Sequence, residues 1–580
     1  MTNKEIADLL RQIARMLEIK GETVYKSLAY RRAAESIEAL GQGVEEIWRE
    51  KKLRTIPGIG PALAKKLDEL LSTGRLTYYE KLKEEVPPGV TALLDIPGVG
   101  PKTAALFLEQ GLLTVADVEA AAREGRLRHL PGMGERAEQK ILEGIEAVGR
   151  RSSRVLLGTA WPIAQELIAQ LRGAVSLEHI ETAGSLRRMS PTIGDIDLLA
   201  AATDTAAVAD AFAHLPLVAS VIAQGPTKVS VMLHAGLQVD LRVVQPRHWG
   251  SALQYFTGSR AHNVRLREMA QKRGLSLSEY GFKRDAEEIS CPTESEVYQL
   301  LGLPWIPPEL REDRGELEAA CEGRLPRLVS MADLRGDLHM HTDWSDGLSS
   351  VEEMIRAAST FGYDYIAISD HSEGLTIANG QSWERLQAQR RQIAQWQAQY
   401  PKLRILQGVE VEIRLDGTLD FADEMLAQLD IVIASLHSGL RQDEAQITAR
   451  AIQAMRNPHV DILAHPSGRI LGQREASAVN LEALIQAAAE TGTILEVNSI
   501  PNRLDLDDVH IRRAIEQGVQ IVINSDAHSA PSLSAIGYGI ATARRGWATP
   551  SDVVNTLPLP ALQERLTRKA ARGKGTAGGE

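Results

Sequence analysis

The chain contains very little cysteine, with only Cys291 and Cys321 among its 580 residues. Two isolated cysteines provide neither a disulfide framework nor a Cys-x-x-Cys metal site, so we expect a reducing, cytoplasmic environment. The sequence also lacks any apolar run near the ~20 residues that a membrane-spanning helix needs. Its first ten residues contain no apolar signal core. We therefore expect no membrane partner.

An excess of positive charge is also missing, because 65 basic residues face 76 acidic ones and the net charge is −11. Taken alone, this balance argues against a nucleic-acid-binding protein. The sum is a poor guide, however, because metal sites require carboxylates and because the local distribution of charge matters more than the total. The length predicts several domains, since single cores stop growing at ~250–300 residues.

The most informative stretch is Gly184–Ala200, GSLRRMSPTIGDIDLLA. Its start offers a tight turn at Gly184, a hydroxyl at Ser185 and two cations at Arg187 and Arg188. These features are suited to binding phosphate. Asp195 and Asp197 follow, two positions apart in an apolar strand pattern, so both carboxylates leave the same face. Two such carboxylates can hold two Mg²⁺ or Mn²⁺ ions ~3.5–4 Å apart for phosphoryl transfer.

A third carboxylate lies in Lys228–Val244, which predicts two strands joined at Ala235-Gly236. Asp240 lies in the middle of the second strand, where a carboxylate needs a partner or a metal. An edge-strand aspartate facing water is the alternative. Beside the Asp-x-Asp pair, the metal interpretation is favoured.

These motifs, followed by YFTGS at Tyr255–Ser259, resemble the family X DNA polymerases of the nucleotidyltransferase superfamily. The resemblance implies that Asp195, Asp197 and Asp240 hold two catalytic Mg²⁺ or Mn²⁺ ions. It also implies a binding site for an incoming dNTP. Ser185 and Arg188 would contact its triphosphate, with Gly184 and Arg187 nearby. Its sugar would lie against Tyr255, Phe256 and Gly258. The minor groove of the nascent base pair would be reached by Asn263 and Arg267. Met189 departs from the family pattern, which often has Gly there.

A short Pro-Gly-x-Gly pattern occurs three times in residues 1–150, a region that reads as helical and has 23 basic and 23 acidic residues. Each copy joins two helical segments, and the free N–H groups at a helix start can bind phosphate oxygens. A mere helical bend is the alternative. The pattern resembles the helix–hairpin–helix motif, which implies sequence-independent DNA binding. Its glycines are Gly58, Gly60, Gly98, Gly100, Gly132 and Gly134.

Lys66 follows the first of these motifs. In family X polymerases this place is occupied by the lysine that forms a Schiff base with an abasic sugar, so the resemblance implies a lyase nucleophile. Lys26 and Arg31 would help to bind a 5′ phosphate. A solvated helical lysine is the alternative.

From residue 333, short apolar runs alternate with helical stretches, which predicts βα units around a parallel sheet or barrel. Six of seven runs end in metal-ligand residue types, a pattern typical of a site at the C-terminal face of a barrel. A lone histidine there is usually structural, but here the ends agree. The region resembles the PHP (polymerase and histidinol phosphatase) domain, which implies up to three Mn²⁺, Zn²⁺ or Fe²⁺ ions, with Glu410 bridging two of them and Asp337 orienting a ligand histidine. The implied ligands are His339, His341, Asp346, His371, Glu410, His437, His465, Asp526 and His528.

The predicted fold is therefore multidomain, with an all-α helix–hairpin–helix N-terminal region, an α+β nucleotidyltransferase palm and thumb, and a C-terminal distorted (β/α)7 PHP barrel. The expected boundaries are a lyase-like domain at 1–80, fingers at 81–150, the palm at 151–260, the thumb at 261–310, a linker at 311–332, the PHP domain at 333–565 and a disordered tail at 566–580.

These expectations together predict a monomeric polymerase that fills short gaps in gapped or nicked DNA. The barrel would act as a metal-dependent 3′–5′ exonuclease that also cuts abasic sites or removes 3′ phosphates. Two alternatives stay open. One is a PHP nuclease or phosphatase that uses its N-terminal half as a DNA-binding arm, and the other is a non-enzymatic DNA-end scaffold.

Overall fold

The computed structural model describes residues 3–38, 44–56, 58–96, 98–151, 154–285 and 287–576. The chain divides into two compact units, one of residues 1–153 with 235–237 and the other of the remaining residues. Within the described ranges, none of the helices has the length and apolar character needed to cross a membrane.

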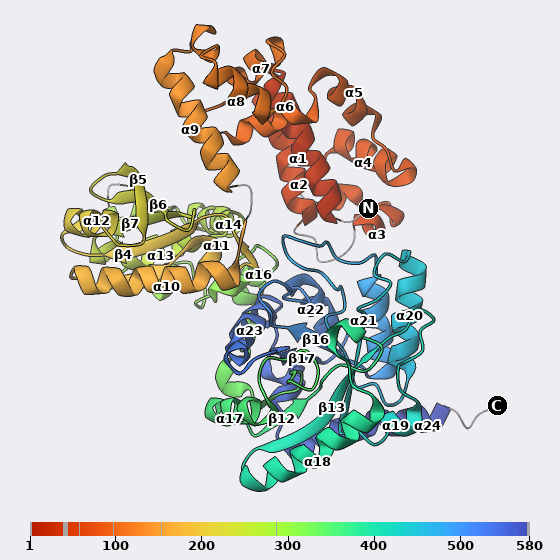
Figure 1. Cartoon of the computed structure of the whole chain (residues 1–580). Coiled ribbons are helices and arrows are strands. Elements are labelled where there is room, and N and C mark those ends of the chain that lie inside the picture. Colours follow the sequence, from red (N-terminus) through yellow and green to blue (C-terminus); the bar gives the residue numbers. More distant parts are fainter. Residues whose placement is uncertain are drawn as a thin grey trace. The chain divides into compact units, whose positions relative to one another are not determined.

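The first unit is helical throughout its described part (Figure 1). Its helices are α1 (Asn3–Ile19), α2 (Val24–Glu38), α3 (Val44–Arg49), α4 (Pro61–Thr73), α5 (Thr77–Glu85), α6 (Pro88–Ala92), α7 (Pro101–Glu109), α8 (Val115–Arg123) and α9 (Glu135–Arg151). Apolar residues at helical spacing form one continuous core, which includes Leu10, Ile13 and Leu17 of α1. The all-α prediction for this region is confirmed.

The three Pro-Gly-x-Gly segments adopt the same local structure. Each follows a 3₁₀ turn, η1 (Leu53–Thr55), η2 (Leu93–Asp95) or η3 (Leu127–His129), and leads into a helix. The first glycine of each motif has a positive φ, +80° at Gly58, +90° at Gly98 and +75° at Gly132, a conformation that favours glycine. Pro57 and Pro97 lie outside the described residues.

The palm is a five-stranded sheet in the order β2-β4-β7-β6-β5. Its strands are β2 (His179–Thr182), β4 (Ile196–Ala201), β5 (Val218–Gln224), β6 (Lys228–Leu233) and β7 (Gln238–Val244), with helices α10 (Leu157–Ala174), α11 (Gly184–Arg187), α12 (Thr205–Ala213) and α13 (Trp249–Thr257) and a small pair β1 (Val155–Leu156) and β3 (Thr192–Ile193). The predicted hairpin is the antiparallel pair β6–β7. Strand β4 pairs with β7 in parallel, which brings the two acidic motifs to neighbouring strands.

The thumb region contains helices α14 (Arg260–Gln271) and α15 (Glu294–Leu300) and a three-stranded sheet of β8 (Ser276–Ser278), β9 (Gly281–Arg284) and β10 (Glu287–Ile289). The expected linker at 311–332 is wrong. It contains helix α16 (Glu316–Cys321), and Leu317 and Ala320 of this helix belong to the thumb core. Arg311 and Glu316 of this segment are buried, and each has a partner of opposite charge or a hydrogen-bonding ring. Arg311 Nη1 donates to Glu294 Oε1 at 2.7 Å, and Glu316 Oε1 lies 2.6 Å from His262 Nδ1.

The C-terminal domain is built on a seven-stranded, entirely parallel sheet in chain order. Its strands are β11 (Gly336–Asp337), β12 (Tyr365–Ile368), β13 (Arg404–Glu412), β14 (Ile431–Ser435), β15 (Ile462–Leu463), β16 (Ile494–Asn498) and β17 (Ile521–Asn524). A parallel bridge between Met340 and Ala527 joins the first strand to the last just beyond their ends. The sheet therefore nearly closes, and the predicted distorted seven-stranded barrel is confirmed.

Helices lie outside the strands of this barrel (Figure 1). They are α17 (Val351–Phe361), α18 (Trp383–Gln399), α19 (Asp423–Leu426), α20 (Glu444–Arg456), α21 (Leu481–Thr491), α22 (Asp508–Glu516), α23 (Ile536–Arg545) and α24 (Leu559–Thr576). Helix α24 includes most of the tail that the sequence analysis expects to be disordered, so that expectation is wrong for residues 566–576. Residues 577–580 lie outside the described part.

Candidate nucleotide site and metal centre

The structure brings the three predicted palm carboxylates together. Asp197 of β4 and Asp240 of β7 are register partners on adjacent parallel strands, and Asp195 precedes β4. Burial raises the pKa of Asp197 to about 7, and the charges of Asp195 and Asp240 add to this shift. A Cβ at Gly184 would meet Asp197 Oδ2 at 2.1 Å, so only glycine fits there. The site is a crowded set of carboxylates that a cation would relieve.

The surroundings of Asp240 complete this picture. Gln238 Nε2 donates to Asp240 Oδ1 at 2.9 Å, and Lys228 Nζ lies 3.2 Å from Asp240 Oδ2. Lys228 was not among the predicted site residues, although it faces Asp240 from the other strand of the hairpin. A donor set made only of carboxylates suits Mg²⁺ or Mn²⁺, so these residues fit the implied metals.

The GSLRR and YFTGS motifs meet at Thr257. Arg188 Nη1 donates to the backbone oxygen of Thr257 at 2.6 Å, and Arg187 Nη1 donates to its hydroxyl at 2.7 Å. Gly258 lies so close to Arg188 that a Cβ there would be 3.1 Å from Nη1. Two motifs about 70 residues apart in the chain therefore form one loop cluster. Between them, Met189 has a φ of +54°, where the family often has glycine.

Two predicted contacts are already engaged within the protein. Arg187 forms a paired interaction with Glu294, at 2.7 and 2.9 Å, and only 14% of its side chain is exposed. Asn263 accepts a hydrogen bond from Gln254 Nε2 and donates one to the backbone oxygen of Tyr255, each at 2.7 Å. Arg187 is thus committed to the thumb rather than free for a triphosphate. Its partner Glu294 gave no sequence signal, because it lies 107 positions away.

The predicted sugar-binding and minor-groove residues lie on neighbouring helices. Tyr255 and Phe256, at the end of α13, pack edge to face with ring centroids 5.2 Å apart, and both are half-buried. The guanidinium of Arg242 lies 4.9 Å from the Phe256 ring. Arg267 is half-buried on α14, and Ser185 is half-buried at the start of α11.

Lys66 of the first unit lies in an aromatic cage. Its ammonium hydrogen-bonds to the hydroxyl of Tyr30 and lies 3.7 Å from the centroid of the Tyr78 ring. Burial and the charge of Lys26 lower the pKa of Lys66. Lys26 and Arg31, expected to bind a 5′ phosphate, form ion pairs with Glu22 at 3.0 Å and Glu18 at 2.8 Å.

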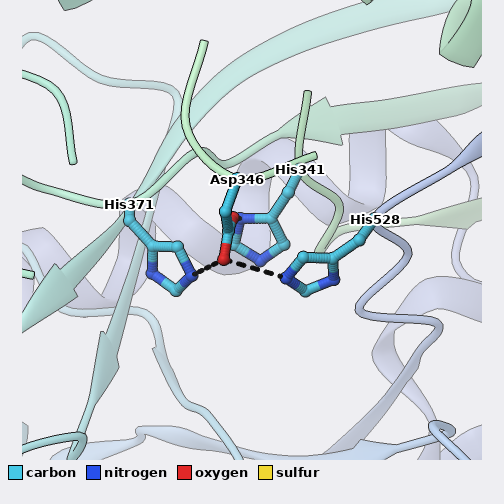
Figure 2. Close-up of side chains that lie close together, drawn as sticks. All are labelled: His341, Asp346, His371 and His528. Atoms are coloured by element: carbon cyan, nitrogen blue, oxygen red, sulfur yellow. Dashed lines mark ion pairs between the residues drawn. The ribbon is translucent and has the colours of Figure 1, made fainter. Parts of the chain in front are cut away.

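The barrel places its nine predicted ligands at or just beyond the C-terminal ends of the strands. Eight of them form three clusters, and within each cluster the ligand atoms lie within 4.8 Å of one another. The clusters are His341, Asp346, His371 and His528; His339, His341 and Asp526; and His371, Glu410 and His437. Figure 2 shows the first, in which Asp346 Oδ2 lies between His371 Nε2 at 3.6 Å and His528 Nε2 at 3.5 Å. His341 belongs to two clusters, and so does His371, so the clusters form one continuous centre.

The unpaired atoms of this centre fit a metal site. Within the described part of the chain, His341 Nδ1 and His465 Nδ1 are buried and have no hydrogen-bond partner. Glu410 Oε2 lies 2.8 Å from His371 Nδ1 and 3.3 Å from His339 Nε2. His465, the ninth ligand, joins the centre through its Nε2, 3.1 Å from Glu410 Oε1. Although burial favours protonated Glu410, the surrounding imidazoles hold its pKa well below the usual range. Buried polar atoms without partners are costly, and a cation would satisfy them.

Two glutamates behind the ligands were missed by the sequence reasoning. Glu496 Oε1 lies 2.6 Å from His339 Nδ1, and Glu412 Oε2 lies 3.0 Å from His437 Nδ1, so each fixes a ligand ring. The predicted orienter, Asp337, instead accepts hydrogen bonds from the backbone N–H groups of His339 and Ser525. The signal that could have found these two glutamates is the one that identified Asp240, namely a carboxylate within an apolar strand.

A pocket of about 330 Å³ opens over the metal centre. Beyond seven of the predicted ligands, it is lined by Leu375, Ile377, Ala378 and Arg503. Ile377 is 93% exposed, an unusual environment for an isoleucine. Arg503 adds a cation at the wall of the pocket, where a phosphate could reach both it and the metals.

Comparison with known proteins identifies the family. The chain is 39% identical to the DNA polymerase/3′-5′ exonuclease PolX of Bacillus subtilis (strain 168) over 573 residues, which is 98% of this chain and 100% of that protein. This chain belongs to the family X DNA polymerases that carry a PHP domain. It is also 26% identical to DNA polymerase lambda of Rattus norvegicus over 53% of this chain and 56% of that protein. A probable phosphatase of Thermoanaerobacter sp. (strain X514) shows 30% identity over 40% of this chain and 94% of its own length.

Four family models match parts of this polymerase. They are a helix-hairpin-helix domain at residues 1–76, a SAM-like helix-hairpin-helix tandem at 90–147, the DNA polymerase beta thumb at 252–312 and the PHP domain at 337–499. The thumb model ends at residue 312, within the segment that the sequence analysis expected to be a linker. The matches confirm the predicted order of helix–hairpin–helix, polymerase and PHP regions.

Proposed function

We propose that this family X polymerase fills short gaps in DNA during base excision repair and removes nucleotides from 3′ ends with its PHP domain. The observation that carries the proposal is the presence of two different ligand sets in one chain. The palm offers only carboxylates, whereas the barrel offers imidazoles and carboxylates together. The first set suits Mg²⁺ or Mn²⁺, and the second suits Mn²⁺, Zn²⁺ or Fe²⁺.

In the palm, Asp195, Asp197 and Asp240 would hold two metals, and Ser185 and Arg188 would hold the triphosphate of a dNTP. The metals, when bound, would stabilise the charge on the attacking and leaving oxygens of nucleotidyl transfer. Asp240 would accept the proton of the primer 3′-hydroxyl, a role that Lys228 and Gln238 support by keeping it ionised. Burial opposes this, but their hydrogen bonds lower the pKa of Asp240.

In the barrel, the nine ligands would hold up to three cations, one for each cluster. Bound there, the cations would supply a nucleophile near neutral pH and neutralise the phosphodiester. Arg503 would bind the phosphate from the wall of the pocket. Glu496 and Glu412 would keep the ligand rings in place. We infer that the chain acts as a monomer on gapped or nicked DNA.

A 5′-labelled primer beside a short gap with a 5′ phosphate tests both activities at once. With Mn²⁺ and dNTPs we expect longer products, and without dNTPs shorter ones. Asp240→Asn should abolish only extension, and His437→Gln should abolish only shortening. Shortening alone by the unaltered protein would contradict the polymerase proposal and favour a nuclease with a DNA-binding arm. If the unaltered protein showed neither extension nor shortening, the result would favour a non-enzymatic scaffold.

The cage around Lys66 favours a lyase as a second activity. A lysine with a lowered pKa is more often unprotonated and therefore nucleophilic. Its amine can form an imine with the aldehyde of an abasic sugar, with loss of water. β-Elimination then breaks the bond between C3′ of that sugar and its phosphate, which leaves. Borohydride would reduce that imine to a covalent protein–DNA adduct. We expect the adduct with the unaltered chain but not with Lys66→Ala. Lys65 is exposed, so Lys65→Ala is the control and should still form the adduct. An adduct that survives Lys66→Ala would exclude Lys66 as the nucleophile.

A further inference from the structure

An arginine of the barrel domain reaches the nucleotide loop of the palm. Arg545, the last residue of α23, donates from Nη1 to the backbone oxygen of Arg188 at 2.7 Å. Only 7% of Arg545 is exposed. The residue that the family resemblance assigns to the triphosphate therefore rests directly on a side chain of the PHP domain.

A shared carboxylate strengthens this link. Glu312 Oε1 accepts hydrogen bonds from Arg188 Nε at 3.0 Å and from Arg545 Nη1 at 2.9 Å. Glu312 therefore fixes the side chain of Arg188, while Arg545 fixes its backbone. Although burial favours protonated Glu312, the charges of Arg545 and Arg188 lower its pKa. The carboxylate stays ionised and holds both arginines.

The barrel also supplies the counter-charge. Arg545 Nη2 lies 2.9 Å from Asp508 Oδ2 at the start of α22, and Arg314 Nη1 donates to the same oxygen at 3.0 Å. A buried guanidinium is tolerated only when it is paired and hydrogen-bonded, so this arrangement specifies arginine at position 545. Lysine could not reproduce it, because one ammonium cannot span Glu312, Asp508 and a backbone oxygen in the geometry of a planar guanidinium.

We infer that Arg545 is a positioning residue for nucleotidyl transfer, through which the PHP domain sets the affinity of the palm for the incoming dNTP. The inference rests on the proposed contact between Arg188 and the triphosphate. It assigns the barrel domain a role in synthesis that does not involve its metal centre.

The neighbouring residue provides a matched control. Arg544 also joins α23 to the segments on either side of α16, because its Nε donates to Glu309 Oε1 at 2.6 Å and its Nη1 to the backbone oxygen of Val329 at 3.0 Å. These contacts of Arg544 are separate from those that hold Arg188 and Glu312. Arg544→Met thus removes an ion pair between the same regions without removing the support of the nucleotide loop.

The test measures single-nucleotide filling of a gapped substrate by the full chain, with dNTP concentration varied, and shortening of the same primer without dNTPs. For Arg545→Met we expect the KM for dNTP to rise about tenfold, the effect of losing a charge-assisted hydrogen bond. Shortening should change less than twofold. Arg544→Met should leave the KM unchanged, and Arg545→Lys should restore little of the loss.

A double-mutant cycle with Glu312→Gln provides a second measurement if Arg545→Met folds poorly. We expect Glu312→Gln to raise the KM by itself and the two effects to be clearly less than additive in the double variant. Equal increases for Arg544→Met and Arg545→Met, or parallel losses of extension, shortening and thermal stability, would overturn the inference. An unchanged KM for dNTP in Arg188→Ala would instead contradict the proposed contact between Arg188 and the triphosphate. The Arg545 variants alone cannot give this result, so the two failures can be told apart.

Discussion

Asp197 and Asp240 stand side by side on parallel strands, as direct register partners of β4 and β7. This arrangement places one carboxylate beside another in a largely buried site. Its cost appears in the pKa of Asp197, which burial and the charges of Asp195 and Asp240 raise to about 7. The palm thus gives up stability at the site that we propose to hold cations.

The first prediction concerns this cost. The pKa of Asp197 is raised on folding, so the folded state loses stability as the pH rises from about 4 to about 7 and loses no more above that. Without divalent ions, Asp197→Asn should therefore raise the melting temperature, by an increment that grows over this interval. Adding Mn²⁺ should stabilise the unaltered chain more than the variant. An increment that is independent of pH between 4 and 7 would contradict the shift.

The second prediction concerns the loop between the two motifs. Met189 has a φ of +54°, a conformation that costs a non-glycine residue roughly 1–2 kcal/mol. Met189→Gly should raise the free energy of unfolding by about 0.5–1 kcal/mol after the greater flexibility of glycine in the unfolded chain is included. Denaturant unfolding measures this directly. Met232→Gly, in the middle of β6, is the control and should be destabilising.

The third prediction concerns the carboxylate behind His339. Glu496 accepts from the His339 ring at 2.6 Å and from the backbone N–H of His465 at 2.9 Å. Glu496→Gln would set an amide N–H₂ against one of these donors, so metal affinity at the barrel should fall roughly 10–100-fold. Metal content after dialysis against a weak chelator measures the loss.

The control for this experiment is Asp461→Asn, which alters a buried carboxylate just before β15, at the opposite end of that strand from His465. Asp461 accepts from the backbone N–H of Val432 at 2.9 Å. It should retain the metal content of the unaltered chain. Equal loss of metal in both variants would mean that general destabilisation of the barrel, rather than the His339 ring, is responsible.

The fourth prediction concerns the helix–hairpin–helix glycines. Gly100 has a φ of −93°, which any residue adopts, and a Cβ there would meet nothing within 4 Å. The protein itself therefore does not demand glycine, whereas close approach of a DNA phosphate would. Gly100→Ala should weaken binding to gapped DNA about three- to tenfold at fixed salt, while the free energy of unfolding changes by less than about 1 kcal/mol.

Gly173 of α10 is a matched control, because a Cβ there also meets nothing within 4 Å and its φ is not positive. Gly173→Ala should leave DNA affinity unchanged. If both variants lost DNA affinity, or if neither did, the result would contradict a specific requirement for glycine at position 100 in DNA binding.

The sequence predicted the architecture well wherever the pattern was local. All seven barrel strands were identified from short apolar runs. Most of the candidate ligands were identified from the polar residues at the ends of these runs, and Asp346 came from the family resemblance. The Asp-x-Asp pair and Asp240 were found in the same way, since a carboxylate inside an apolar strand is conspicuous. These signals depend only on neighbours in the chain.

The failures involve charged residues whose partners are distant. A segment rich in charge and proline normally lies at the surface, which is why 311–332 was interpreted as a linker. Arg311 is nevertheless fully buried, because Glu294 neutralises it from α15. The same glutamate pairs with Arg187, which is therefore not free for the triphosphate contact that the sequence predicted. Pairings of this kind arise only when the thumb has folded, so no local pattern predicts them.

The burial of this segment has a consequence for how the two activities share a substrate. The stretch that follows the thumb is packed into its core and tied to the barrel domain through Glu312 and Arg314, so it does not behave as a loose tether. We therefore expect palm and barrel to keep their relative position while a primer is exchanged. A 3′ end that needs trimming must leave one site and travel to the other by itself, and the balance between synthesis and degradation should follow the lifetime of the frayed end rather than a motion of the enzyme.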